Sequence, residues 1–177
     1  MPSRQLDHQE VMSKRPRIKR EVEIILVLDQ LIFQENIAGI CRVANSMGVK
    51  EVWLVAEQKL IQSKNFRSIS RLNSKSIALR TFESVHKIRE EINHIKKDSY
   101  KVVALEFTDK SDSIVKWNPS GKIILIAGSE RHGISQELLD ISDQAVHIPM
   151  LGDVSSLNVN QAVSIALYEI RRNQLIS

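Results

Sequence analysis

The chain has 177 residues, of which 42% are apolar and 26% are charged, as in an ordinary globular domain. It holds no run of about eighteen uncharged apolar residues, and no apolar segment follows its charged N-terminus, so we expect neither a membrane span nor a secretory signal. The single cysteine, Cys41, excludes an internal disulfide and a cysteine-cluster metal site, and a cytoplasmic setting is expected.

Two clusters of basic residues stand out in a chain of net charge +4. The sequence divides into a basic arm, residues 1–21, and one domain, residues 22–177. The arm carries Arg4, Lys14, Arg15, Arg17, Lys19 and Arg20, and the stretch 57–80 carries Lys59, Lys64, Arg67, Arg71, Lys75 and Arg80. Each cluster is either a surface that contacts RNA phosphates or a solvated segment, and charge alone leaves both open.

The first half of the domain has the pattern of a β-strand, a helix and a second strand. Residues 22–28 form a β-branched apolar run, which is typical of a buried strand. Asn36 is a plausible N-cap for a helix over 36–47, and Gly48 stands where a helix-terminating glycine belongs. Residues 52–55 are the next strand, and a short helix is possible over 65–71.

Further strands alternate with helices in the second half. The strands are expected over 76–82, 100–107, 122–127 and 146–148, and the helices over 83–97, 136–141 and 158–173. This alternation predicts an α/β fold with a mostly parallel sheet flanked by helices. The chain-level rules favour an open sheet, because knots are rare. Trp117, in the loop 108–120, is predicted to be a packing residue rather than a platform for base stacking.

Polar, glycine-bearing loops follow two of the expected strands, as at the ligand site of a parallel α/β sheet. In the loop from Gly128 to Gly133, Glu130 can fix a polar group or accept a proton, and His132 is an acid–base candidate. Neither the P-loop pattern nor the dinucleotide fingerprint occurs, and no residues have metal-ligand spacing. Ser155 to Asn158 stand at a helix N-terminus, where they either bind an anion or cap the helix.

Three ordered motifs together resemble the SpoU/TrmH branch of the SPOUT RNA methyltransferases. The motifs are Asn36-x5-Arg42, then Gly128-Ser-Glu-Arg-His-Gly133, and finally Ile148-Pro-Met with Ser155-Ser-Leu-Asn-Val159. The resemblance covers the chain from about Val22 to Asn173. Each motif alone has little specificity, but the ordered set is highly specific.

The resemblance implies a SPOUT fold whose C-terminal segment forms a deep trefoil knot, and an S-adenosylmethionine pocket. It also implies a homodimer that shares its active sites across the interface. The residue spacing and the lack of a long apolar run predict, for their part, that the protein binds neither metal nor membrane. The implied catalytic residues are Arg42, Asn36, Glu130, Ser156 and Asn158. The implied cofactor-binding residues are Leu105, Gly128, Ile148, Met150 and Leu157.

The reaction implied by the resemblance is methyl transfer to a ribose 2′-hydroxyl of RNA. A guanosine in the D-loop of tRNA is the favoured target. Ribosomal RNA, a non-catalytic RNA-binding relative of the same fold, and a small-molecule enzyme that uses the same cofactor remain alternatives. Because arginine almost never loses its proton in proteins, we expect Arg42 to clamp a phosphate and the developing charge rather than to act as the base.

Overall fold

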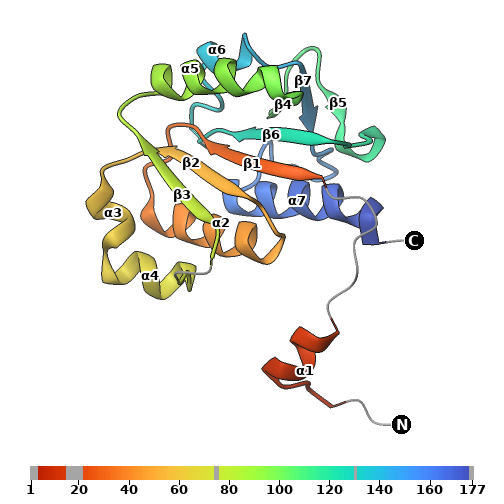
Figure 1. Cartoon of the computed structure of the whole chain (residues 1–177). Helices are drawn as coiled ribbons and strands as arrows, with labels where there is room; N and C mark the ends of the chain where they lie inside the picture. The colour runs from red at the N-terminus through yellow and green to blue at the C-terminus, as the bar shows by residue number, and fades with distance from the viewer. Residues whose placement is uncertain (1–3, 15–21, 74–75, 130, 176–177) are drawn as a thin grey trace.

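A computed structural model describes residues 4–14, 22–73, 76–129 and 131–175 of the chain. These residues form a seven-stranded sheet in the order β3-β2-β1-β6-β4-β7-β5, and every neighbouring pair is parallel (Figure 1). The strands are β1 (Glu23–Leu28), β2 (Glu51–Val55), β3 (Ala78–Phe82), β4 (Tyr100–Leu105), β5 (Asp112–Ser113), β6 (Lys122–Ala127) and β7 (Gln144–His147). The predicted α/β class is confirmed.

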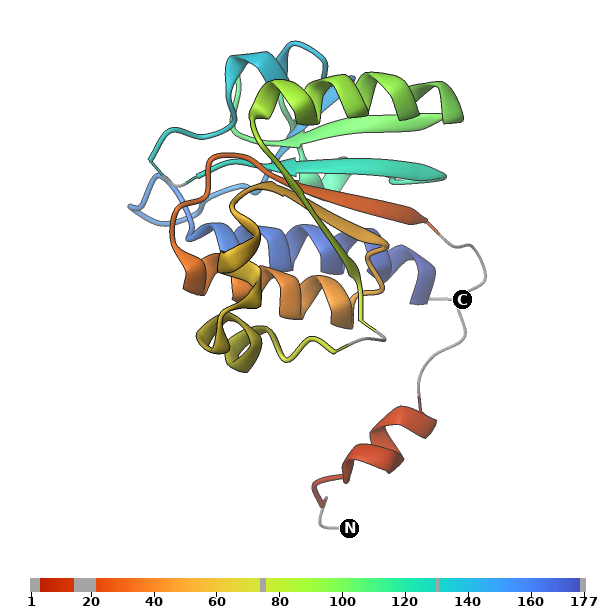
Figure 2. The ribbon, with the colours of Figure 1, turned by 60° about the vertical axis from the view of Figure 1, so that its left-hand side comes forward.

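The helices cover both faces of this sheet, with α5 and α6 above it and α2 and α7 below it in the view of Figure 1, and Figure 2 shows the same layers from another side. The α-helices are α1 (His8–Ser13), α2 (Gln34–Ser46), α3 (Gln58–Gln62), α4 (Lys64–Ser70), α5 (Val85–Ile95), α6 (Gln136–Leu139) and α7 (Val159–Leu175). Two 3₁₀ turns, η1 (Lys96–Asp98) and η2 (Ile114–Lys116), complete the described elements.

Strand residues alternate between two hydrophobic cores, because successive side chains point to opposite faces of a sheet. In β1, Ile24 and Leu26 belong to the core between the sheet and helices α2 and α7, whereas Ile25 and Val27 belong to the core between the sheet and α5. Burial on both faces explains why these strands read as continuous apolar runs. Trp117 is 7% exposed within the first core, so its predicted packing role is confirmed.

The helix after β1 differs from its prediction at the start. It begins at Gln34 with Phe33 as the N-cap, so Asn36 is the third helical residue and the predicted N-cap is wrong. The side chain of Gln34 donates to the Ser63 hydroxyl and, at 3.5 Å, to the Leu60 carbonyl. This contact with the α3–α4 corner extends the helix past the sequence-based start. Gly48 has φ 65° just after the helix, as predicted.

Strand β4 ends two residues before the predicted boundary, at Leu105, and the very short β5 was not predicted. The register aligns Leu28, Ala127 and Leu105 across β1, β6 and β4, so these strands finish together at one edge of the sheet. The residues that follow continue the ladder, since Asp29 donates its backbone N–H to the Ala127 carbonyl at 2.9 Å. This carboxyl edge is where ligands bind in open α/β sheets.

Candidate functional site

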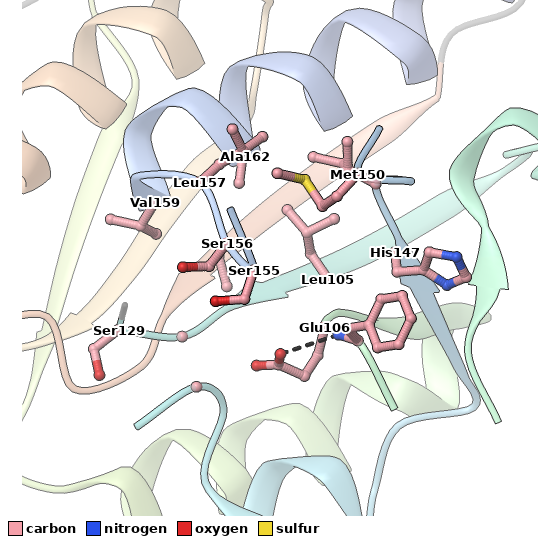
Figure 3. Close-up of a pocket in the computed structure, with 15 residues that line it drawn as sticks. Leu105, Glu106, Ser129, His147, Met150, Ser155, Ser156, Leu157, Val159 and Ala162 are labelled. Atoms are coloured by element: carbon pink, nitrogen blue, oxygen red, sulfur yellow. Dashed lines mark hydrogen bonds between the residues drawn. The ribbon is translucent and has the colours of Figure 1, made fainter. Parts of the chain in front are cut away.

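A cavity opens at the carboxyl edge, between the ends of β4, β6 and β7 and the segment that leads into α7 (Figure 3). Its wall combines apolar side chains, three serine hydroxyls, one carboxylate and an aromatic pair. The lining residues are Leu105, Glu106, Phe107, Ala127, Gly128, Ser129, Gly133, His147, Ile148, Met150, Ser155, Ser156, Leu157, Val159 and Ala162. All five residues predicted to bind a cofactor are among them.

The loop after β6 folds tightly back on itself. The Gly133 N–H donates to the Ser129 carbonyl at 2.8 Å, and the His132 N–H donates to the Ser129 hydroxyl at 3.2 Å. A Cβ on Gly128 would overlap the backbone of Gly133 and Ile134, so only glycine fits there. Gly133 itself has φ 65°, a left-handed conformation that favours glycine. Glu130, a predicted catalytic residue, lies outside the described residues.

Two carboxylates from neighbouring strands hold the exit of this loop. Glu106, just after β4, accepts the Ile134 N–H at 3.0 Å, and Asp29, just after β1, accepts the Ser135 N–H at 2.6 Å. Since β6 lies between β1 and β4, the loop is anchored from both sides. Asp29 is fully buried, and its second carboxylate oxygen has no partner within the described chain.

Sequence reasoning missed both carboxylates. The available signal was an acidic residue directly after an apolar strand, which is the same signal that selected Glu130. The predicted strand ran through Glu106 to Phe107, and this boundary hid the position of Glu106 at the edge of the sheet.

The predicted catalytic residues are only partly brought together. Ser156 is exposed at the cavity wall, and Asn158 donates from its side-chain amide to the Asn36 side chain at 3.3 Å. Asn158 also accepts the Asn160 N–H at 2.9 Å, as the cap of α7. Arg42 is exposed on α2 and, like Asn36 and Asn158, is not part of the cavity wall.

An aromatic pair closes one end of the cavity. The rings of Phe107 and His147 lie 4.5 Å apart between centroids, and the Ser111 hydroxyl lies 2.9 Å from Nδ1 of His147. Phe107 is 71% exposed although it is strongly apolar, so it forms a rim that a flat ring can contact. His132, the predicted acid–base candidate, is exposed and does not line the cavity.

The described residues offer neither a metal site nor a reactive thiol. Within them, no group of three or more His, Cys, Asp or Glu side chains could hold a metal ion, and no helix is long and apolar enough to cross a membrane. Burial raises the pKa of the Cys41 thiol to about 12, so it stays protonated at neutral pH and is unsuited to nucleophilic attack.

The fold and this edge define a class of protein: a parallel α/β domain with a glycine-framed ligand cavity between its central strands. Within that class, the model of the SpoU rRNA Methylase family matches residues 23–168. Because this match spans most of the chain, the protein belongs to that family.

Comparisons with characterised relatives agree with the family. The chain is 29% identical to the 23S rRNA (guanosine-2′-O-)-methyltransferase RlmB of Acinetobacter baylyi, over 86% of this chain and 60% of RlmB. It is 26% identical to the tRNA (guanosine(18)-2′-O)-methyltransferase of Escherichia coli, over 88% of this chain and 66% of that enzyme. The chain thus spans less than two thirds of the length of both relatives.

A solved structure shows the same fold. The SpoU methyltransferase AviRb of Streptomyces viridochromogenes, crystallised in complex with the cofactor AdoMet, superposes with a TM-score of 0.75 at 23% identity. The superposition covers 89% of this chain and 60% of AviRb. The SPOUT assignment is therefore confirmed at the level of the fold, and the knot stays a prediction.

Proposed function

We propose that this protein transfers a methyl group from S-adenosylmethionine to a ribose 2′-hydroxyl of RNA. The observation that carries the proposal is the convergence of Leu105, Gly128, Ile148, Met150 and Leu157 on one cavity. These residues come from three separate segments of the chain, and the motif resemblance implies the same five residues as the cofactor-binding set. Membership of the SpoU family supports the same activity.

The cavity fits the chemistry of this cofactor. Gly128 lets the backbone of the loop lie where any side chain would block it, and the apolar wall suits an adenine ring and the methylene groups next to the sulfur. When bound, S-adenosylmethionine supplies a methyl group on a sulfonium. The closeness of residues 148–157 to the 128–133 loop also supports our proposal that the C-terminal segment is threaded as a trefoil knot.

Arg42 is proposed to bind the RNA phosphate next to the reacting ribose and to stabilise the negative charge that develops on its 2′-oxygen. A hydroxyl is a weak nucleophile until it loses its proton, so negative charge that develops on the ribose oxygen must be stabilised. A guanidinium that grips the adjacent phosphate does this, and it lets a phosphate oxygen take the proton. Asn36 and Asn158, joined by their side chains, would fix the substrate beside Ser156. Glu130 is proposed as a further catalytic residue on the motif resemblance alone.

The placement of Arg42 favours its use by a second copy of the chain. Six residues of α-helix separate Asn36 from Arg42, which displaces Arg42 by about 9 Å along the axis and about 120° around it. Asn36 is bonded to the segment that leads into α7, whereas Arg42 is exposed and does not line the cavity. Exposed apolar residues on the neighbouring helix α7, Ile165 at 41% and Tyr168 at 53%, give such a copy a surface to contact.

Mixing two inactive variants tests both the activity and the shared site. Arg42→Ala and Gly128→Ala should each abolish methylation of total RNA by labelled S-adenosylmethionine. If Arg42 acts in the partner's site, random reassortment of dimers restores about a quarter of wild-type activity, because half the dimers have one intact site of two. If methylation activity does not recover although the subunits have exchanged between dimers, Arg42 acts in the site of its own subunit. Active enzyme that sediments as a monomer would refute the homodimer.

One face of α4 is proposed as the RNA-binding surface, together with the arm 1–21. Of the basic residues in 57–80, Lys59 is paired with Glu57, and Arg80 is paired with Glu91. Three others, Lys64, Arg67 and Arg71, are exposed and form no salt bridge within the described chain. Lys64 and Arg67 are three residues apart on one face of α4, and Arg71 is the C-cap that ends this helix, which packs on α2.

Neutralising this α4 face should weaken RNA binding selectively. The variant Lys64→Gln/Arg67→Gln/Arg71→Gln should raise KM for RNA about tenfold to hundredfold, change kcat less than about threefold, and flatten the salt dependence. Lys97→Gln/Lys101→Gln/Lys116→Gln removes the same charge from exposed positions elsewhere and is the control. Equal KM values for RNA in the two variants would show that α4 is not part of the RNA-binding surface.

For the substrate, we propose a guanosine in the D-loop of tRNA, in the cytoplasm and without a metal ion. The relative from Escherichia coli acts on guanosine 18 of tRNA, and the RlmB relative acts on 23S rRNA, so ribosomal RNA is the second candidate. Mapping of 2′-O-methyl sites in cells with and without the gene discriminates between them. RNA binding without any methyl transfer would instead identify a non-catalytic relative.

A further inference from the structure

The carboxylate of Glu106 is the one acidic side chain among the described residues that line the cavity. Its Oε1 accepts the Phe107 N–H at 3.0 Å, and its Oε2 accepts the Ile134 N–H at 3.0 Å. It forms no salt bridge with any described residue. A carboxylate can accept about four hydrogen bonds, so about half of this capacity is left for a donor in the cavity.

The lack of a side chain at Gly133, in the loop after β6, leaves room for the Glu106 carboxylate. A Cβ on Gly133 would come within 2.5 Å of Oε2 of Glu106, so a larger residue there would displace the carboxylate. The two backbone N–H groups also fix the direction in which the remaining lone pairs point. Glu106 is half-buried rather than buried, so a ligand can reach it.

Position along the cavity indicates which ligand group meets Glu106. In Figure 3 it lies between the His147 end and the Ser129 end of the cavity. A ligand whose flat ring contacts Phe107 and whose reacting group faces Ser156 and Asn158 would place its middle at Glu106. In S-adenosylmethionine the middle is the ribose, whose vicinal hydroxyls are two adjacent donors. Dinucleotide-binding folds likewise set a strand-end carboxylate against a ribose hydroxyl.

We propose that Glu106 binds the ribose diol of the cofactor and selects for ligands that carry both hydroxyls. The inference rests on the proposed function, because it takes S-adenosylmethionine as the ligand. It assigns Glu106 a binding role in addition to its hold on the Gly133–Ile134 loop. A purely structural Glu106 would affect every ligand alike, whereas a diol-binding Glu106 affects only ligands with hydroxyls.

Calorimetry with the full chain separates these two roles. The probes are S-adenosylhomocysteine and its 2′-deoxy and 3′-deoxy analogues. Each deletion should weaken binding about thirtyfold in the wild type and about fivefold in Glu106→Gln, because a charged acceptor bonds about twice as strongly as a neutral one. Ser155→Ala changes another polar residue of the cavity wall and should keep the thirtyfold penalty.

Two outcomes contradict the inference: a wild type indifferent to both hydroxyls, or equal penalties in the wild type and Glu106→Gln. If the glutamine variant binds too weakly to measure, the wild type still decides by NMR. The carboxyl carbon signal of Glu106 should move when the parent binds and stay put when the 2′,3′-dideoxy analogue binds; an equal shift with both ligands overturns the inference. Failure of the proposed function looks different, since the wild type would then bind no S-adenosylhomocysteine at all.

Discussion

The two edges of the central sheet are built on opposite plans. At the amino edge, charged groups are matched by the chain itself: Lys50 is paired with Glu23, and Arg171 donates to the carbonyls of Val22, Met47 and Gly48. At the carboxyl edge, the described cavity residues form no salt bridge, and buried oxygens of Asp29 and Ser135 have no partner in the described chain. Charged side chains thus tie the chain together at the amino edge, whereas the one carboxylate of the cavity at the carboxyl edge, Glu106, forms no ion pair within the described chain.

This contrast separates changes in stability from changes in binding. Substitutions at the amino edge should lower the free energy of unfolding and leave the cofactor affinity of the folded protein intact. Substitutions of the residues that line the cavity should chiefly lower cofactor affinity, because the cavity is shaped by the close backbone approach at Gly128.

The largest effect is expected from Arg171→Met. Arg171 is 5% exposed, and its loss would leave three backbone carbonyls without their donor. Denaturant unfolding should show a loss of about 3–5 kcal/mol. Arg172→Met is the control, because Arg172 forms a partly exposed i,i+3 pair with Glu169 that is worth about 0.5 kcal/mol or less and bonds no backbone carbonyl in the described contacts. Equal losses in the free energy of unfolding for both variants would mean that the backbone hydrogen bonds of Arg171 stabilise the amino edge no more than a surface ion pair does.

At the carboxyl edge, Gly128→Ala should weaken binding of S-adenosylhomocysteine about hundredfold. The new Cβ would overlap the backbone of Gly133, so the loop would have to leave the position in which it lines the cavity, and overpacking of this kind costs about 1–3 kcal/mol. Gly152→Ala is the matched control, because a Cβ there meets nothing within 4 Å. Calorimetry measures both affinities, and similar values for the two variants would show that the loop is free to rearrange.

The sequence predicted the strands and the cavity wall well, for physical reasons. Strands buried on both faces must be apolar throughout, as in β1 and β6, and glycines in a tight loop have no substitute, as at Gly128. The start of α2 was mispredicted because the contact of Gln34 with the α3–α4 corner outweighs the capping preference of Asn36. Glu106 was missed because its partner, Ile134, lies 28 residues further along the chain.

The smallest expected effect returns to the amino edge, where hydrogen bonds from Tyr100 and then Lys50 lower the pKa of Glu23 below its usual 4.5. A group whose pKa is lowered by folding stabilises the folded state above its unfolded pKa, and this contribution is lost as the pH falls through the folded value. Glu23→Gln should therefore be less stable than the wild type at pH 7, by less than about 1 kcal/mol because the pair is partly exposed and screened. The difference should vanish in acid, below the folded pKa of Glu23. Tyr100→Phe should reduce the loss of stability that occurs as the pH falls through the folded pKa of Glu23, because the Tyr100 hydroxyl is the main cause of the lowered pKa. Neither change should alter cofactor affinity at the carboxyl edge. A stability gap that persists undiminished at low pH would mean that Glu23 acts through packing rather than charge.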